Sequence, residues 1–288
     1  MADTSARIDG VIEADELIVG EGVVVEAGVL IRGLDGPARK VVLGEHCYVG
    51  RETRILAPEF RLGDYSKLNA FSFGHGAHPL QIGRNCWIGG NTVLDSLGGL
   101  DIDDNVGIGA HSQIWTHIRF GDVLQGCRFN GNKYMHIQKD AWLVGHCVVS
   151  PVEVGERSMA LLGSVVTQDM EPNHVYGGAP AKDLTERMGP QFDAPTVEQK
   201  LATLRELLER FQRETARFKD RIRVVSSPQE LEEGIACFDV ADRTYTRSEC
   251  GAHVAFLKWL LPLAKFTPRG APPFISARPP TDPVEATG

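Results

Sequence analysis

The chain has no run of basic residues. Acidic side chains outnumber basic ones by 38 to 30, and the formal net charge is −8 at pH 7. Binding to nucleic acid depends on a clustered positive face that neutralises phosphates. We therefore expect no nucleic-acid partner.

Long apolar segments are also missing. The most apolar stretch, residues 252–263, is interrupted by Lys258 and Pro262 and is too short to cross a bilayer. Residues 1–10 are polar and acidic and lack the apolar core of a secretory signal. We expect a cytoplasmic location and no membrane span.

The six cysteines include no pair with CxxC spacing, so a structural zinc site of that type is unsupported. Cys47, Cys86 and Cys147 share one position of a six-residue repeat, the small position that faces inward. Free cysteine usually behaves as a small buried hydrophobe. We therefore predict buried thiols at these three positions.

The repeat runs from about residue 43 to residue 166, and each unit opens with a large aliphatic residue that is often followed by glycine. The opening residues are Leu43, Val49, Ile55, Leu62, Leu68, Ile82, Ile88, Leu94, Ile102, Ile108, Ile114, Ile137, Leu143, Val149, Val154, Ala160 and Val166. A period of six fits neither an amphipathic helix nor a simple alternating strand. Fixed short periods are typical of solenoids, in which each rung stacks on its neighbours.

A second regularity lies four residues after each opening residue, where the side chain is small. Examples are Thr53, Thr92, Ser112 and Ser158. A large and a small residue at fixed offsets favour a narrow triangular coil, in which the large side chain fills the interior. Glycines supply the permissive backbone that repeated bends require.

This pattern resembles the hexapeptide-repeat acyltransferases over roughly residues 19–184. The resemblance implies a mainly β fold, the left-handed parallel β-helix. Parallel crossovers are nearly always right-handed, so the left-handed sense follows from the resemblance alone. It also implies a homotrimer with sites between neighbouring columns.

The organisation that we predict has four parts. Residues 1–184 form the β-helical acyltransferase domain, with a loop insertion over residues 119–136 where the repeat fails. Residues 185–196 are a linker marked by Gly189, Pro190 and Pro195. Residues 197–267 form an amphipathic helix and a small α+β appendage, and residues 268–288 form a proline-rich tail, extended or disordered.

Residues 91–117 end in the segment QIWTH, directly before the insertion. They resemble the acetyltransferase pattern in which Asn and Asp precede, by one coil, a histidine that closes an I-x-T-type segment. The resemblance implies that His117 is the general base, Asp95 contacts the acceptor and Asn91 is a polar contact. In this sequence Thr116 and His117 are adjacent, whereas the family often has one or two residues between them.

Residues 163–184, GSVVTQDMEPNHVYGGAPAKDL, resemble the closing coil of the same family. There this region lines the coenzyme A channel. The resemblance implies that Ala160, Ser164 and Lys182 contact acetyl-CoA, which acts as a co-substrate, and that no cofactor is tightly bound.

Two other functions remain open at this point. Asn91, His111 and His146 share one outward phase, and imidazoles on successive coils could bind zinc, as in the γ-class carbonic anhydrases, which residues 144–164 also resemble. A non-catalytic β-helical scaffold is the third possibility. The function that we expect is transfer of an acetyl group from acetyl-CoA to a hydroxyl, or an amine, of a sugar or similar small acceptor.

Overall fold

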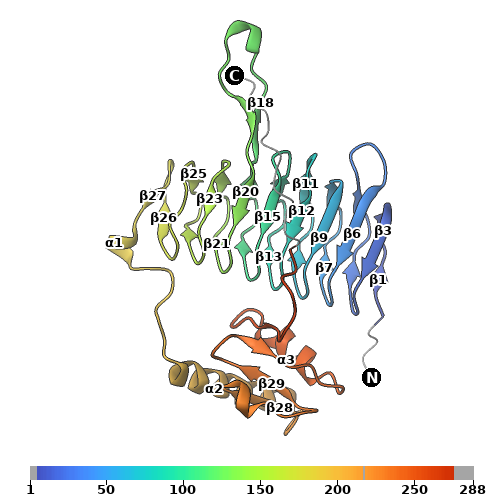
Figure 1. The fold of residues 1–288 in the computed structure, drawn as a ribbon, viewed down its shortest axis with the longest axis vertical. Helices are drawn as coiled ribbons and strands as arrows, with labels where there is room; N and C mark the ends of the chain where they lie inside the picture. Colours follow the sequence, from blue (N-terminus) through green and yellow to red (C-terminus); the bar gives the residue numbers. More distant parts are fainter. Residues whose placement is uncertain (1–4, 217, 276–288) are drawn as a thin grey trace.

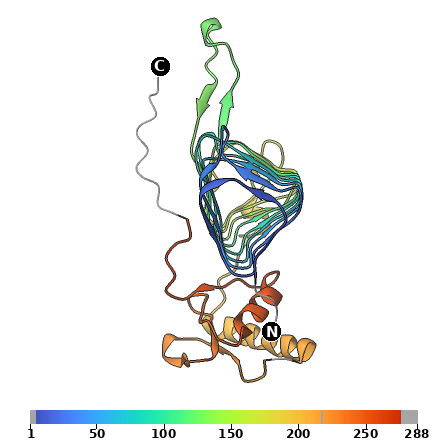
Figure 2. The ribbon, with the colours of Figure 1, turned by 90° about the vertical axis from the view of Figure 1, so that its right-hand side faces the viewer.

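The computed structural model describes residues 5–216 and 218–275. Between Arg7 and Asp183 the chain winds into a three-sided column, whose faces are three sheets, here called A, B and C (Figures 1 and 2). Each coil places one strand on each face, and the strand pairs in parallel with the strand one coil earlier. The column is the parallel β-helix that the repeat predicts, in the left-handed form that the family resemblance implies.

The strands of the column are short, and most have two or three residues. Sheet A contains β1 (Arg7–Ile8), β4 (Val24–Val25), β7 (Tyr48–Val49), β10 (Lys67–Leu68), β13 (Trp87–Ile88), β16 (Gly107–Ile108), β21 (Trp142–Leu143), β24 (Met159–Ala160), β26 (Val175–Gly177) and β27 (Lys182–Asp183). Sheet B contains β2 (Val11–Ile12), β5 (Leu30–Arg32), β8 (Arg54–Leu56), β11 (Phe73–His75), β14 (Val93–Asp95), β17 (Gln113–Ile114), β22 (Val148–Val149) and β25 (Val165–Val166). Sheet C contains β3 (Ala14–Val19), β6 (Ala38–Leu43), β9 (Glu59–Leu62), β12 (Leu80–Ile82), β15 (Leu100–Ile102), β20 (Met135–Ile137) and β23 (Glu153–Val154).

The aliphatic residues that open the units fill the interior of the column. Ile55, Leu94 and Ile114 stack along sheet B and are completely buried. Cys47, Cys86 and Cys147 are buried free thiols, as predicted. The coils begin at Arg7, earlier than residue 19 where the repeat becomes recognisable, because the first strands lack the aliphatic–glycine signal.

Two corners of the column are regular turns with one residue in the left-handed region of backbone space. Between sheets C and A these residues are His46, Tyr65, Asn85, Asn105, Asp140, Arg157 and Asn173, and between sheets A and B they are Glu52, Phe71, Asn91, His111 and His146. Asn, Asp and His tolerate positive φ better than most side chains do. The corner between sheets B and C does not repeat this turn from coil to coil in the described residues, and its connections vary in length.

The predicted insertion leaves the column at this third corner as an arm. Strands β18 (His117–Arg119) and β19 (Asn130–Asn132) pair antiparallel, and the short 3₁₀ helix η1 (Val123–Gln125) lies between them. Figure 2 shows the arm extending away from the column. The arm therefore begins with His117 itself.

After the column come helix α1 (Thr185–Met188) and the longer helix α2 (Val197–Thr215). Thr196 and Gln199 form a capping box at the start of α2, each side chain bonding the other residue's backbone N–H. A small sheet follows, in the order β28 (Ile222–Val225), β29 (Ala236–Asp239), β30 (Thr244–Tyr245) and β31 (Thr267–Pro268), with η2 (Pro228–Glu230) and α3 (Ala252–Leu260) in its connections. This α+β unit is the appendage.

The appendage packs against the corner between sheets C and A (Figures 1 and 2). Tyr65 of the column belongs to the appendage's apolar cluster. The Arg243 guanidinium donates two hydrogen bonds to the carboxylate of Asp140, at 2.7 and 2.8 Å. The Asn85 amide donates to the Phe266 carbonyl at 3.0 Å. The contacts come from three turns of a single corner.

No helix in the described part of the chain is long and apolar enough to cross a membrane. The predicted tail lies mostly outside the described residues, which end at residue 275.

Replacing Arg243 with alanine should loosen the appendage, because Asp140 would then be a buried carboxylate without its partner. We expect a loss of about 2 kcal/mol in the free energy of docking. Limited proteolysis within residues 189–196 should become faster, whereas Arg213→Ala, on the exposed face of α2, should leave the rate unchanged.

Burial raises the pKa of Asp140, but the hydrogen bonds and charge of Arg243 outweigh this effect, and the net pKa is lowered. The contribution is therefore present above the pKa of an unfolded Asp, about 4, and is lost as the pH falls through the lowered value. Cleavage rates that are the same for both variants at neutral pH would contradict this account.

Candidate active site

The third corner of the column brings Asp95 and His117 together. Asp95 ends strand β14, and His117 begins β18, where the chain leaves the column for the arm. The Asp95 side chain is completely buried, and that of His117 is 20% exposed. A buried carboxylate thus lies directly beneath a partly exposed imidazole.

Asp95 is held by four donors. Its Oδ2 atom accepts hydrogen bonds from the Thr116 backbone N–H at 2.7 Å, from the Thr116 hydroxyl at 2.6 Å and from His117 Nδ1 at 2.8 Å. Its Oδ1 atom accepts from the Leu97 N–H at 3.2 Å. The adjacency of Thr116 and His117, which departs from the family pattern, lets both residues bond the same oxygen.

Burial raises the pKa of Asp95, but the hydrogen bonds from Thr116, His117 and Leu97 outweigh this effect and hold the net pKa below its usual value. Asp95 is therefore ionised at neutral pH and can only accept hydrogen bonds. His117 must then carry its proton on Nδ1, which leaves the Nε2 lone pair available to an incoming proton.

A shallow groove of about 220 Å³ lies beside His117. It is lined by Trp115, His117, Ile118, Val148, Ser150, Pro151, Val165, Val166 and Thr167. Most of these residues come from strands β22 and β25 and the turns after them, which follow His117 along the column. An extended apolar arm with a reactive group at its end could lie in such a groove.

The predicted acceptor contacts lie in two different places. Because Asp95 is buried and its Oδ2 atom is fully engaged, the structure favours a role in positioning His117 over the acceptor contact that we predicted. Asn91 is exposed in the turn between sheets A and B, four residues before Asp95 and at the opposite end of strand β14. That separation is roughly 13 Å along an extended strand, so Asn91 and His117 do not meet within one chain.

The predicted coenzyme A contacts also separate. Ala160 and Ser164 both point into the column and are fully buried, and the Ser164 hydroxyl donates to the Leu161 carbonyl. Their side chains therefore cannot line a channel, and contact with acetyl-CoA through backbone groups of this region stays a prediction. Lys182 is exposed in β27, at the closing end of the column.

The predicted alternative metal ligands, His111 and His146, stack on successive turns of the corner between sheets A and B. Their ring centroids are 4.9 Å apart, and the rings lie within 20° of parallel. Stacked rings present their faces to each other, so their nitrogens do not converge on one ion. Among the described residues, no group of three or more His, Cys, Asp or Glu side chains could hold a metal ion.

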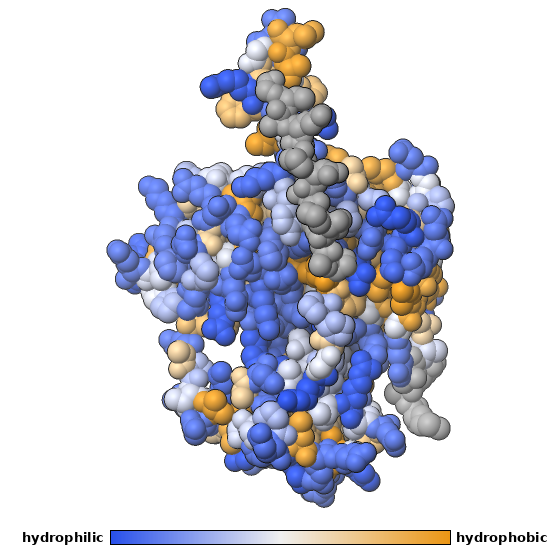
Figure 3. All heavy atoms as spheres, viewed as in Figure 1, coloured by the Kyte–Doolittle hydropathy of each residue, from blue (hydrophilic) through white to orange (hydrophobic). Residues whose placement is uncertain are grey.

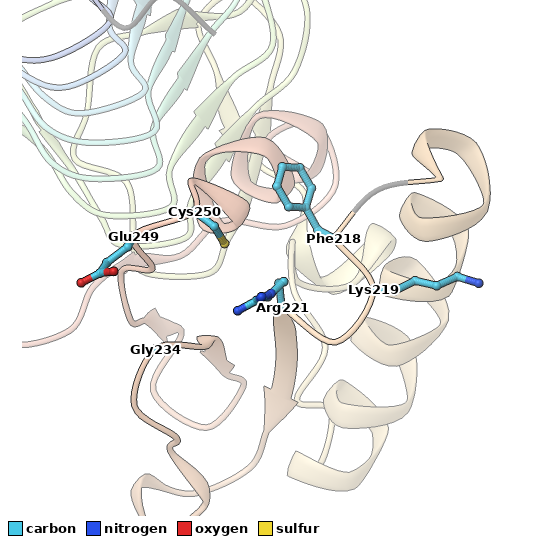
Figure 4. A pocket seen from close by; sticks show the side chains of 6 residues that line it. All are labelled: Phe218, Lys219, Arg221, Gly234, Glu249 and Cys250. Carbon is cyan, nitrogen blue, oxygen red and sulfur yellow. The ribbon is translucent and has the colours of Figure 1, made fainter. Parts of the chain in front are cut away.

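A larger cavity, about 450 Å³, lies in the appendage and is lined by Phe218, Lys219, Arg221, Gly234, Glu249 and Cys250. In Figure 4 the Lys219 side chain extends away from Arg221 and Cys250. The cavity brings no acid–base pair together, so its size does not make it the reactive centre.

Sequence reasoning missed three neighbours of the Asp95–His117 pair. They are Thr116, which binds Asp95, Trp115, whose ring lies edge-on to His117 at 5.8 Å, and His75, whose ring centroid is 6.5 Å from that of His117. A coil length of 20 residues between Lys67 and Trp87 could have placed His75 beside Asp95. No spacing signal identifies Thr116 as a ligand of the carboxylate.

The tautomer of His117 is a testable consequence of this geometry. Nitrogen-15 NMR of the neutral imidazole should show a protonated Nδ1 and an unprotonated Nε2. In Asp95→Asn the acceptor of that proton is lost, and the neutral tautomers should become mixed. An Nε2-protonated ring in the unmodified protein would contradict the assignment. His78, which is exposed one coil before Asp95, serves as the reference ring.

Part of the chain is similar in sequence to named acetyltransferases. No family model matches the chain. A galactoside O-acetyltransferase from Escherichia coli is 33% identical over 121 residues, which cover 40% of this chain and 57% of that protein. A provisionally named serine acetyltransferase from Schizosaccharomyces pombe is 30% identical over 116 residues, 40% of each chain. The chain thus spans about half the length of the curated relatives that it matches.

Among solved structures, a hexapeptide-repeat-containing acetyltransferase from Vibrio cholerae is 24% identical and covers 52% of this chain and 74% of its own, with a TM-score of 0.36. A superposition this partial adds nothing to the fold, which rests on the register of the column itself. In its β-helical part, the chain is similar in sequence to acetyltransferases, a galactoside O-acetyltransferase among them.

Proposed function

We propose that the protein transfers an acetyl group from acetyl-CoA to a hydroxyl group of a sugar or similar small acceptor. The observation that carries this proposal is the buried Asp95 carboxylate, which binds Nδ1 of His117 beside an apolar groove. The matched galactoside O-acetyltransferase is named for a reaction of this type. An amine acceptor would use the same groups.

The proposed reaction is a direct transfer. Nε2 of His117 takes the proton of the acceptor hydroxyl as the oxygen attacks the thioester carbonyl carbon. When the tetrahedral intermediate collapses, the carbon–sulfur bond breaks, and the departing thiolate receives the proton from the imidazolium. Asp95 keeps the ring oriented and stabilises its charged form without taking up the proton itself. No acyl group is attached to the enzyme at any stage.

The donor would lie in the groove along β22 and β25, with its reactive end at His117. The apolar side chains Val148 and Val165 suit a pantetheine arm, and backbone groups near Ala160 and Ser164 could bond its amides. Lys182, exposed at the end of the column, is available to a phosphate group. A cytoplasmic location stays a prediction.

Replacing His117 with alanine should lower kcat for transfer by about 10²–10⁴-fold, with the affinity for CoA unchanged. Asp95→Asn should lower kcat by about 10²-fold, because the ring can adopt the wrong tautomer. Thiol release from acetyl-CoA in the presence of sugars, nucleotide sugars and amines measures both effects. Asp9→Asn, at an exposed site in the first coil, is the matched control.

Near-normal turnover by His117→Ala would remove this residue from the proposed role. Running the same assay with a chelator separates the two enzyme classes, since a zinc enzyme of the carbonic anhydrase type would lose activity and the acyltransferase would not. A wild-type protein that releases no thiol with any acceptor would instead favour the scaffold.

We further infer that the working form is a homotrimer. The arm exposes apolar side chains at its tip, and Phe120 and Leu124 are 101% and 91% exposed. Figure 3 shows apolar side chains gathered at this end of the molecule. Such groups are normally covered by a partner. Assembly would also bring the Asn91 corner of one column toward the His117 corner of the next, as the family resemblance implies.

Light scattering should give a particle of three chain masses in solution. The double substitution Phe120→Ser and Leu124→Ser should shift the protein toward the monomer, because it removes two apolar contacts worth about 2 kcal/mol each when buried. Substituting serine for the exposed Leu263 of the appendage is the control. A monomeric wild-type protein at assay concentration would rule the trimer out.

A further inference from the structure

Strand β11 (Phe73–His75) directs its side chains outward and contributes none to the core. At the inward position of this strand the neighbouring coils carry Ile55 and Leu94, whereas β11 has Gly74. A Cβ atom on Gly74 would lie 2.8 Å from both Ile55 Cδ1 and Leu80 Cδ2, so the interior at this rung is already filled. The side chains of Phe73 and His75 therefore lie on the surface, one coil before Asp95.

His75 lies on the side of Asp95 that His117 does not use. Its Nε2 atom is 3.8 Å from Asp95 Oδ1, which is too long for a hydrogen bond. The rings of His75 and His117 are 6.5 Å apart between centroids and nearly perpendicular, at 79°. Two imidazoles thus flank one buried carboxylate, and a hydroxyl-bearing molecule could contact both rings.

Phe73 supplies an apolar surface next to His75. The two rings stack at 4.9 Å and within 22° of parallel, and the Phe73 side chain remains 37% exposed. A flat apolar face beside a hydrogen-bonding group matches a pyranose ring, which has apolar C–H faces and hydroxyl groups at its rim.

The groove and the two rings of β11 lie on opposite sides of His117 along the column. Val148 and Val165, which line the groove, belong to coils after His117, whereas Phe73 and His75 belong to the coil before Asp95. A thioester arm in the groove would leave the β11 side open to the second substrate.

We propose that Phe73 and His75 bind the acceptor, and that the acceptor is a hexopyranose. The Phe73 ring covers the apolar face of the sugar, and His75 bonds a hydroxyl next to the one that attacks. This inference rests on the proposed acyltransferase function, and it assigns the acceptor class and the residues that select it.

The experiment measures thiol release from acetyl-CoA with methyl hexopyranosides of the galacto, gluco and manno series. His75→Ala and Phe73→Ala should each raise KM for the best sugar by about tenfold, with KM for acetyl-CoA and the slow hydrolysis of acetyl-CoA within twofold of wild type. Phe73→Trp should keep the low KM, and His75→Gln should restore part of it, because Gln retains a hydrogen-bonding group. His78→Ala, in the same loop, is the control and should match wild type.

Unchanged KM for the sugar in both alanine variants, or a raised KM for acetyl-CoA instead, would overturn the inference while the acyltransferase function stands. Transfer to amines but to no sugar would have the same meaning. If no acceptor gives thiol release, the proposed acyltransferase function fails. Sugar binding by Phe73 and His75 is then tested separately in the His117→Ala variant, through the fluorescence of Trp115. Binding that disappears in the double variant His117→Ala, His75→Ala supports the sugar site, and the absence of binding overturns it.

Discussion

The fold depends on the stacking of inward aliphatic side chains in register from coil to coil. Ile88 pairs with Leu68 on one side and Ile108 on the other, each separated by 20 residues. A slip of one residue would turn every inward side chain to solvent, so the register tolerates little variation. The register from coil to coil is therefore fixed, and two corners repeat the same left-handed turn. Only the corner between sheets B and C is free to vary, and there the column carries Asp95, His117 and the arm.

The column itself could be predicted from the sequence because its cause is periodic. An inward position every six residues leaves a visible pattern, and the buried Cys47, Cys86 and Cys147 follow from it. The same pattern places Ala160 and Ser164 at inward positions. Ligand contacts in this part of the column would therefore be made by backbone groups.

The site was only partly predictable because the phase of a hexapeptide does not say which corner a residue occupies. His46, His111, His117 and His146 all stand three residues after an opening aliphatic, yet they lie at three different corners. His117 was distinguished by the insertion that follows it. The hydrogen bond between His117 and Asp95 could not be predicted from the sequence, since a carboxylate that contacts a substrate and one that orients a histidine have the same spacing. The contact between Arg243 and Asp140, 103 residues apart, has no local signal at all.

His117 lies at the base of the arm, so the position of its imidazole depends on the position of the arm. His117 pairs with Asn132 in the antiparallel ladder, while its ring bonds Asp95 of the column. The residue thus belongs to both structures, and a movement of the arm must either carry the imidazole or break one of these contacts. Phe120 and Leu124 are exposed at the tip of the arm, where a neighbouring subunit that packs on the arm would contact them. A neighbouring column that buried the tip would fix the ladder, orient the ring and exclude water from the groove in a single step. Assembly and proton transfer would then depend on one short ladder.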